Sequence, residues 1–75
     1  VGSTEVDFVA EKQGSYTYFQ VTADMTAQET FEREMKPLRR IRDNYEKIVL
    51  TGDRLTLGNY DGIQVKYLPD WLLEK

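Results

Sequence analysis

Apolar and polar residues alternate in two neighbouring stretches near the start of the chain. Residues 5–12 and 15–23 show the period-two pattern of half-buried β-strands, and the second stretch is rich in aromatic and β-branched side chains. Gln13-Gly14 between them predicts a two-residue turn, because glycine tolerates the positive φ angles that such turns need. The pattern therefore predicts a β-hairpin.

This turn fixes the register of the hairpin, since the residue numbers of paired positions then have a constant sum. Val6 would face Val21 and Phe8 would face Phe19 on one side of the two strands. All four side chains are apolar, so we expect this face to lie in the core. Asp7 would face Gln20 and Glu5 would face Thr22 on the opposite side of the two strands.

A helical pattern follows the hairpin. Thr26 and Glu29 have the spacing of a capping box, in which Thr26 would be the N-cap. Pro37 interrupts the apolar stripe behind it and predicts a bend or a division into two short helices, and Asp43-Asn44 would end the helical stretch. The stripe has helical spacing and consists of Ala27, Phe31, Met35, Leu38, Ile41 and Tyr45.

The rest of the chain predicts two more strands and a last helical turn. Residues 47–51 predict a short strand, whose continuous apolar run at residues 48–50 is typical of an interior position, and residues 63–68 alternate as a strand. Glycines in residues 52–62 indicate a loop or a loose hairpin, and Pro69-Asp70 would begin a short helix. The order is β-β-α-β-β-α, an α/β or α+β fold with a mixed four-stranded sheet and one proline-bent helix packed on it.

The composition of the chain excludes several classes of function. A chain of 75 residues predicts one small domain, and without Cys or His it lacks the residues for thiolate zinc sites and for Ser-His-Asp or Cys-His catalysis. A net charge of −3 argues against strong non-specific DNA binding. There is no apolar run long enough for a membrane span and no signal-peptide pattern, so we expect a cytoplasmic protein with no membrane partner.

Polar side chains converge on the hairpin face that carries Asp7, Gln20 and Thr22. Metal-dependent phosphodiester hydrolysis uses carboxylates that hold Mg²⁺ and a lysine that stabilises developing charge. An Asp on one strand, with an acid-x-Lys sequence on its hairpin partner, supplies these groups because residues i and i+2 point the same way.

Several segments together resemble a known family. They are Glu5-Val-Asp-Phe-Val9, Gln20-Val-Thr22, Glu32-Arg-Glu34, Arg42-Asp-Asn-Tyr45 with Lys47, and Gly62-Ile63 with Trp71-Leu-Leu73. The run is similar to a C-terminal domain of unknown function in bacterial and archaeal AAA+-type ATP-binding proteins. The resemblance implies a PD-(D/E)xK, restriction-endonuclease-like fold, with residues 1–75 as one nuclease-like domain from the C-terminal part of a larger ATPase.

The residues at the motif positions depart from that family of nucleases. The resemblance makes Asp7 the metal carboxylate, position 20 a second carboxylate and position 22 the lysine, but Gln20 and Thr22 stand there. Glu5 shares the face and would be the substitute ligand, while an ordinary solvated carboxylate is the alternative for Asp7. We therefore expect a nuclease fold without its catalytic set, which is not an enzyme by itself. No GxxxxGK[ST] motif occurs, so ATP and magnesium would belong to an ATPase module elsewhere.

The helix offers a candidate nucleic-acid surface. Arg33, Lys36 and Arg40 share one helical face and could contact phosphate, although i,i+4 ion pairs on a solvated helix are the simpler interpretation. Tyr16 and Tyr18 could likewise stack on bases or pack under a helix or a neighbouring domain.

Three functional hypotheses follow. The first is a non-catalytic accessory or regulatory domain that contacts its own ATPase module or a protein partner. The second is a divergent Mg²⁺- or Mn²⁺-dependent nuclease that uses Asp7 with Glu5 or Gln20. The third is nucleic-acid binding without cleavage through Arg33, Lys36 and Arg40.

Overall fold

The first element of the fold is a hairpin whose turn is formed by Gln13 and Gly14. The structure, a computed structural model, describes residues 6–73. Strand β1 (Phe8–Lys12) pairs antiparallel with β2 (Ser15–Thr22). Gln13 and Gly14 have φ angles of 54° and 85°, as a type I′ turn requires. Phe8 lies opposite Phe19, so the predicted register is confirmed.

The helix α1 (Gln28–Arg39) begins later than the capping-box pattern predicts. Its N-cap is Ala27, which makes no side-chain capping bond. Thr26 instead donates its hydroxyl to Asp24 Oδ1 at 2.6 Å, and its backbone N–H donates to the same oxygen at 2.7 Å. The prediction of Thr26 as the N-cap is therefore wrong, because a local turn at Asp24 has taken its hydroxyl.

The helix also ends earlier than its apolar stripe suggests. Pro37 lies in the last turn, where its missing N–H removes one bond of the ladder, and no second helix follows within residues 40–45. Ile41 and Tyr45 thus leave the helical stripe. Asp43, expected at the end of the helix, instead accepts a hydrogen bond from Tyr18 of β2. This tertiary contact favours a loop over a continued helix.

The sheet has five strands rather than the four predicted. The strands β3 (Glu46–Thr51), β4 (Gly58–Tyr60) and β5 (Ile63–Tyr67) complete it in the order β1-β2-β3-β5-β4. The three inner strands are parallel to one another and both edge strands are antiparallel to their neighbours. The extra strand β4 lies in the segment that the glycine pattern marked as a loop or loose hairpin. The mixed sheet and the interior position of β3 are confirmed.

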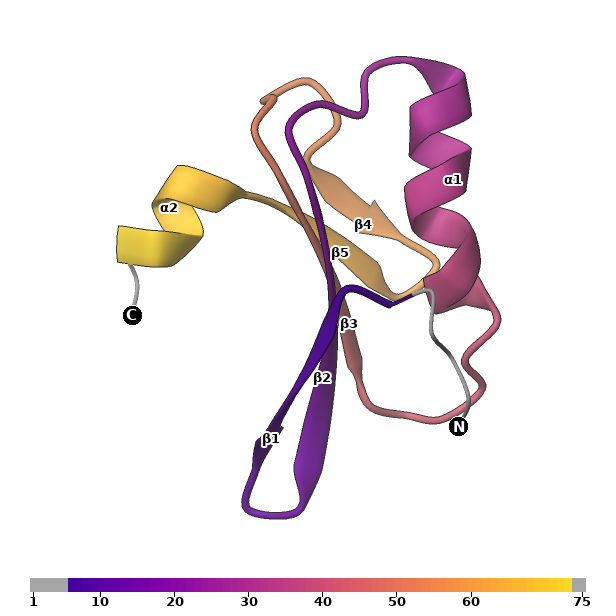
Figure 1. The fold of residues 1–75 in the computed structure, drawn as a ribbon, viewed down its shortest axis with the longest axis vertical. Helices are drawn as coiled ribbons and strands as arrows, with labels where there is room; N and C mark the ends of the chain where they lie inside the picture. Colours follow the sequence, from indigo (N-terminus) through magenta and orange to yellow (C-terminus); the bar gives the residue numbers. More distant parts are fainter. Residues whose placement is uncertain (1–5, 74–75) are drawn as a thin grey trace.

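Two apolar clusters lie on opposite sides of the sheet. The larger one lies under α1 and includes Met35, Leu38 and Val49. The smaller one lies under the six-residue helix α2 (Leu68–Leu73), where Trp71 packs on Phe19. Figure 1 shows α1 and α2 on the two sides of the sheet. No helix within residues 6–73 is long and apolar enough to cross a membrane.

The expected core face of the hairpin is only partly buried. Phe19 is buried, but Phe8 and Val21 remain 43% and 38% exposed. Val6 packs against the cluster under α1 instead, because the regular strand begins only at Phe8. The main core therefore lies on the other face, where α1 covers Tyr18 and its neighbours. A strand pattern alone could not indicate which face the longer helix would cover.

A buried carboxylate, that of Asp53, joins the end of β3 to the connection that follows β2. Asp53 is 9% exposed. One oxygen accepts bonds from the Met25 N–H and the Thr51 hydroxyl at 2.9 and 2.7 Å. The other accepts bonds from the N–H groups of Leu55 and Thr56 and from the Thr56 hydroxyl. Burial by itself would raise the pKa of Asp53, but these hydrogen bonds outweigh it and hold the pKa well below its usual value.

We expect Asp53→Asn to lower the free energy of unfolding by at least about 2 kcal/mol, because an amide cannot accept all of these bonds and leaves buried donors unpaired. The depressed pKa stabilises the fold above the unfolded-state value of about 4, and this stabilisation is lost as the pH falls below it. Between pH 7 and pH 3, the free energy of unfolding measured by chemical denaturation should fall less in the variant than in the unsubstituted chain. Asp61→Asn, at an exposed turn position, is the control and should behave like the unsubstituted chain.

Candidate functional site

The first motif residue, Asp7, lies just before β1 and is bonded to β2. Its backbone N–H donates to Gln20 Oε1 at 2.8 Å, and its Oδ2 accepts the N–H of Val21, also at 2.8 Å. The carboxylate thus satisfies a backbone donor near the end of the hairpin ladder. Asp7 remains exposed to solvent. It therefore joins the two strands at the end away from the turn without entering the apolar core.

The second motif position, Gln20, is a buried tie between the hairpin and the helix. Its side chain accepts from Asp7, and its Nε2 donates to the Glu34 carbonyl oxygen at 3.2 Å and to Glu34 Oε1 at 3.4 Å. Gln20 is 4% exposed. An amide has both a donor and an acceptor, whereas an ionised carboxylate only accepts. The contacts of this site therefore select glutamine.

Asp7 and Gln20 line a pocket of about 390 Å³ against the helix α1. The helix contributes Arg33, Glu34 and Lys36, together with Pro37. Two of the three candidate nucleic-acid residues thus lie beside the motif residues. Nothing in the sequence pattern indicated that the helix face and the hairpin motif would meet. Glu34 was not among the candidate site residues. Its only signal was its place in the Glu32-Arg33-Glu34 segment of the family resemblance.

The electrostatics of this pocket centre on Glu34. Its burial raises the pKa of its carboxyl group, the negative charge of Asp7 raises it further, and Arg33 lowers it. The Arg33 Nε lies 4.0 Å from Glu34 Oε2, at the limit of an ion pair. Two carboxylates, a lysine and an arginine therefore line one small surface, and such a set can attract a cation or a phosphate.

The remaining candidates do not join this pocket. Thr22 lies at the end of β2, where its hydroxyl donates to the Asp24 carbonyl oxygen at 3.2 Å. Arg40 is the exposed C-cap of α1, and Glu5 lies outside the described residues. Within residues 6–73, no group of three or more acidic side chains is placed to hold a metal ion.

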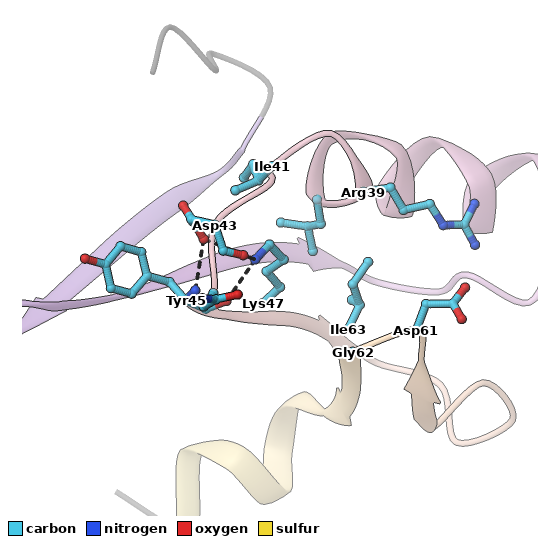
Figure 2. A pocket seen from close by; sticks show the side chains of 10 residues that line it. Arg39, Ile41, Asp43, Tyr45, Lys47, Asp61, Gly62 and Ile63 are labelled. Carbon is cyan, nitrogen blue, oxygen red and sulfur yellow. Dashed lines mark hydrogen bonds and ion pairs between the residues drawn. The ribbon is translucent and has the colours of Figure 1, made fainter.

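A second pocket, of about 380 Å³, opens between the end of α1 and the starts of β3 and β5. Asp43, Tyr45 and Lys47 lie at one end, and Arg39 and Asp61 lie at the other (Figure 2). Lys47 Nζ donates to the carbonyl oxygens of Asp43 and Tyr45 and to Asp43 Oδ1, at 3.0, 2.9 and 3.2 Å. Three acceptors therefore occupy the lysine.

Tyr18 of β2 also belongs to this second network of hydrogen bonds. Its hydroxyl donates to Asp43 Oδ2 at 2.6 Å. This bond, with burial, raises the pKa of Tyr18 to about 12, and the same bond contributes most to lowering the pKa of Asp43. Tyr18 is buried, whereas Tyr16 is exposed and packs edge-to-face on Tyr45. Packing under the helix is thus confirmed for Tyr18, which is not accessible for stacking on bases.

Gln20→Glu, which restores a carboxylate at the second motif position, should destabilise the chain. The new carboxylate would face the Glu34 carbonyl oxygen without a hydrogen to donate and would lie near two acidic side chains. We expect a loss of about 2 kcal/mol or more in the free energy of unfolding at pH 7, the cost of a buried unpaired polar group. Gln28→Glu, the same change in the exposed first turn of α1, should cost nothing measurable in the same denaturation experiment.

Glu34→Gln, in contrast, should stabilise the chain at neutral pH. Since the folded state raises the pKa of Glu34, its contribution to stability is complete below the unfolded-state value of about 4.3 and is lost as the pH rises through the folded-state value. The variant should gain up to about 1 kcal/mol over the unsubstituted chain at pH 7 and nothing at pH 3. Glu29→Gln, on the exposed face of α1, should show no such pH-dependent gain.

Comparison with known proteins finds one segment of similar sequence in a longer chain. A protein of Haemophilus influenzae strain Rd, described as an uncharacterized protein, is 40% identical over 72 residues. The match covers 96% of this chain but 17% of that relative, so the chain spans less than a fifth of its length. No model of a known family matches the chain, and no solved structure matches it.

Proposed function

We propose that this chain is a non-catalytic accessory or regulatory domain of a cytoplasmic AAA+-type ATP-binding protein, with a restriction-endonuclease-like fold that has lost its catalytic residues. ATP and magnesium would be bound by the ATPase module of the longer protein. The domain would contact that module or a protein partner.

The bonding of Gln20 is the observation that carries this proposal. In a PD-(D/E)xK nuclease the corresponding side chain would hold the metal, but here both ends of the amide bond to protein groups, Asp7 N–H and the Glu34 carbonyl oxygen. Asp7 itself accepts the Val21 N–H. The two motif positions are thus used to join β1, β2 and α1, which supports a structural rather than a catalytic role.

The order of elements and the matched relative also support it. An antiparallel hairpin, a crossover helix and a parallel strand beside β2 are compatible with the expected nuclease-like core. The relative carries the matching segment within a much longer chain, which is how an accessory domain of a larger protein would occur.

A second candidate function rests on the pocket shared by Asp7 and the helix. Glu34 lies beside Asp7, and Arg33 and Lys36 line the same surface, so two carboxylates and two cations could serve a divergent metal-dependent nuclease or bind nucleic acid. Because Gln20 is bonded within the protein, this set would have to act without the second motif position.

The accessory role is tested on the Haemophilus influenzae relative in its full length. We expect Mg²⁺-dependent ATP hydrolysis, with a rate that changes at least about threefold when the segment matching this chain is removed. Circular dichroism of the truncated protein checks that the remainder is folded. Absence of ATP binding and hydrolysis from the full-length protein would overturn the proposal.

The nuclease alternative is tested on the 75-residue chain. Mn²⁺ titration by calorimetry and cleavage of plasmid DNA are compared for the chain, for Asp7→Asn and for the control Asp61→Asn. The proposal expects no cleavage above background in any of them. Metal-dependent cleavage that disappears in Asp7→Asn and persists in Asp61→Asn would establish the nuclease instead. DNA binding that falls steeply with salt and weakens in Lys36→Ala would favour the nucleic-acid role.

A further inference from the structure

Strand β1 is an exposed edge of the sheet. It lies at the end of the order β1-β2-β3-β5-β4 and pairs with β2 over five consecutive residues without a bulge. All five residues, Phe8–Lys12, are exposed, and none of them is a proline. Figure 1 shows the hairpin extending away from the helices, with β1 on its outer side. A regular edge of this kind is a template for another strand.

The backbone groups that face outward can be assigned from the turn. In a hairpin with a two-residue loop, the residues that flank the loop form a hydrogen-bonded pair, here Lys12 and Ser15. Bonded and non-bonded pairs then alternate along the strands. Ala10 and Phe8 therefore direct their N–H and C=O groups to β2, whereas Val9 and Glu11 direct theirs away from the sheet.

Apolar side chains flank this edge on both faces. Phe8 stacks on Phe19 on the side of α2 and is 43% exposed. Val9 lies opposite Tyr18 on the side of α1 and is 49% exposed. An added strand would cover both side chains, so its gain would include apolar burial as well as backbone hydrogen bonds.

The opposite edge is a much poorer template. Strand β4 has three residues, of which Gly58 has a φ angle of 148°. Its short length and its glycine limit the number of regular backbone bonds that a further strand could make. The preference for one edge thus follows from the structure.

We propose that the edge of β1 receives an extended strand from elsewhere in the longer protein to which this domain belongs. This inference rests on the proposed function, which places the domain in such a protein. The relative supplies the argument for the occupant, since the segment matching this chain is 17% of its length and most of that protein lies outside it. The inserted strand would carry apolar residues beside Phe8 and Val9 and a basic residue beside Glu11, because opposite charges on paired strands attract.

Hydrogen exchange at single-residue resolution tests the proposal on the full-length relative. In an open edge strand only alternate amides are protected, whereas a strand paired on both sides protects all of them. We expect the amides that align with Val9 and Glu11 to exchange within about 10-fold of the amide that aligns with Ala10. Exchange at least about 100-fold faster at those two positions than at the Ala10 position would overturn the proposal.

The 75-residue chain is the matched comparison. By itself it should show the alternating pattern, with Ala10 slow and with Val9 and Glu11 fast, at every protein concentration. Protection of Val9 and Glu11 that increases with the concentration of the chain would assign the edge to a second copy and would also overturn the proposal.

A pair of substitutions separates the backbone contact from the side chain. Glu11→Pro removes an N–H that β2 does not use, a change that edge strands tolerate, whereas Glu11→Ala keeps this N–H. Made at the aligned position of the relative, proline should raise exchange at the Val9 position by at least about 10-fold, and alanine should leave it unchanged. Equal exchange in the two variants would contradict strand addition.

The outcome is independent of the ATPase assay. Full protection of the edge in a relative that does not hydrolyse ATP would overturn the proposed function and would still support the addition of a strand to β1. An ATPase with an open edge would do the reverse.

Discussion

The fold depends most on the buried carboxylate of Asp53. Its bonds to Met25 and Thr51 join the connection after β2 to the end of β3, and those to Leu55 and Thr56 set the course of the loop toward β4. Beside it, a Cβ atom on Gly52 would lie 2.5 Å from the Ala23 carbonyl oxygen, so only glycine lets the two strand ends approach. This junction fixes the position from which α1 starts, and therefore which face of the sheet the helix covers.

Gln20 plays a comparable role at the middle of α1, where its side chain bonds to Glu34. One buried amide joins the start of the hairpin to the backbone of the helix. Under the proposed function, the glutamine at this position makes a packing contact out of a catalytic position of the nuclease motif. A carboxylate and an amide of similar shape differ here in one property, the ability to donate a hydrogen bond.

The two faces and the two edges of the sheet are unequal. The helix α1 covers one face over twelve residues, whereas α2 covers part of the other over six, and Phe8 and Val21 remain partly exposed. The long edge at β1 adjoins the same exposed residues. An uneven distribution of apolar surface is typical of a domain that rests against more protein, which is the setting that the accessory role requires.

The sequence by itself determined the hairpin and its register, because turn geometry and side-chain alternation act between near neighbours. The apolar run of β3 and the order of the elements also indicated the interior position of that strand and the mixed sheet. Tertiary structure decided the rest. The helix cap is an exception, because Asp24, only two residues away, accepts the Thr26 hydroxyl. The bond from Tyr18 holds Asp43 in a loop, and α1 covers the hairpin face that carries Gln20. Glu34 joined the site only because the helix laid it beside Asp7. These outcomes depend on groups distant in the chain, whose approach is fixed by packing and by the pairing of buried polar atoms.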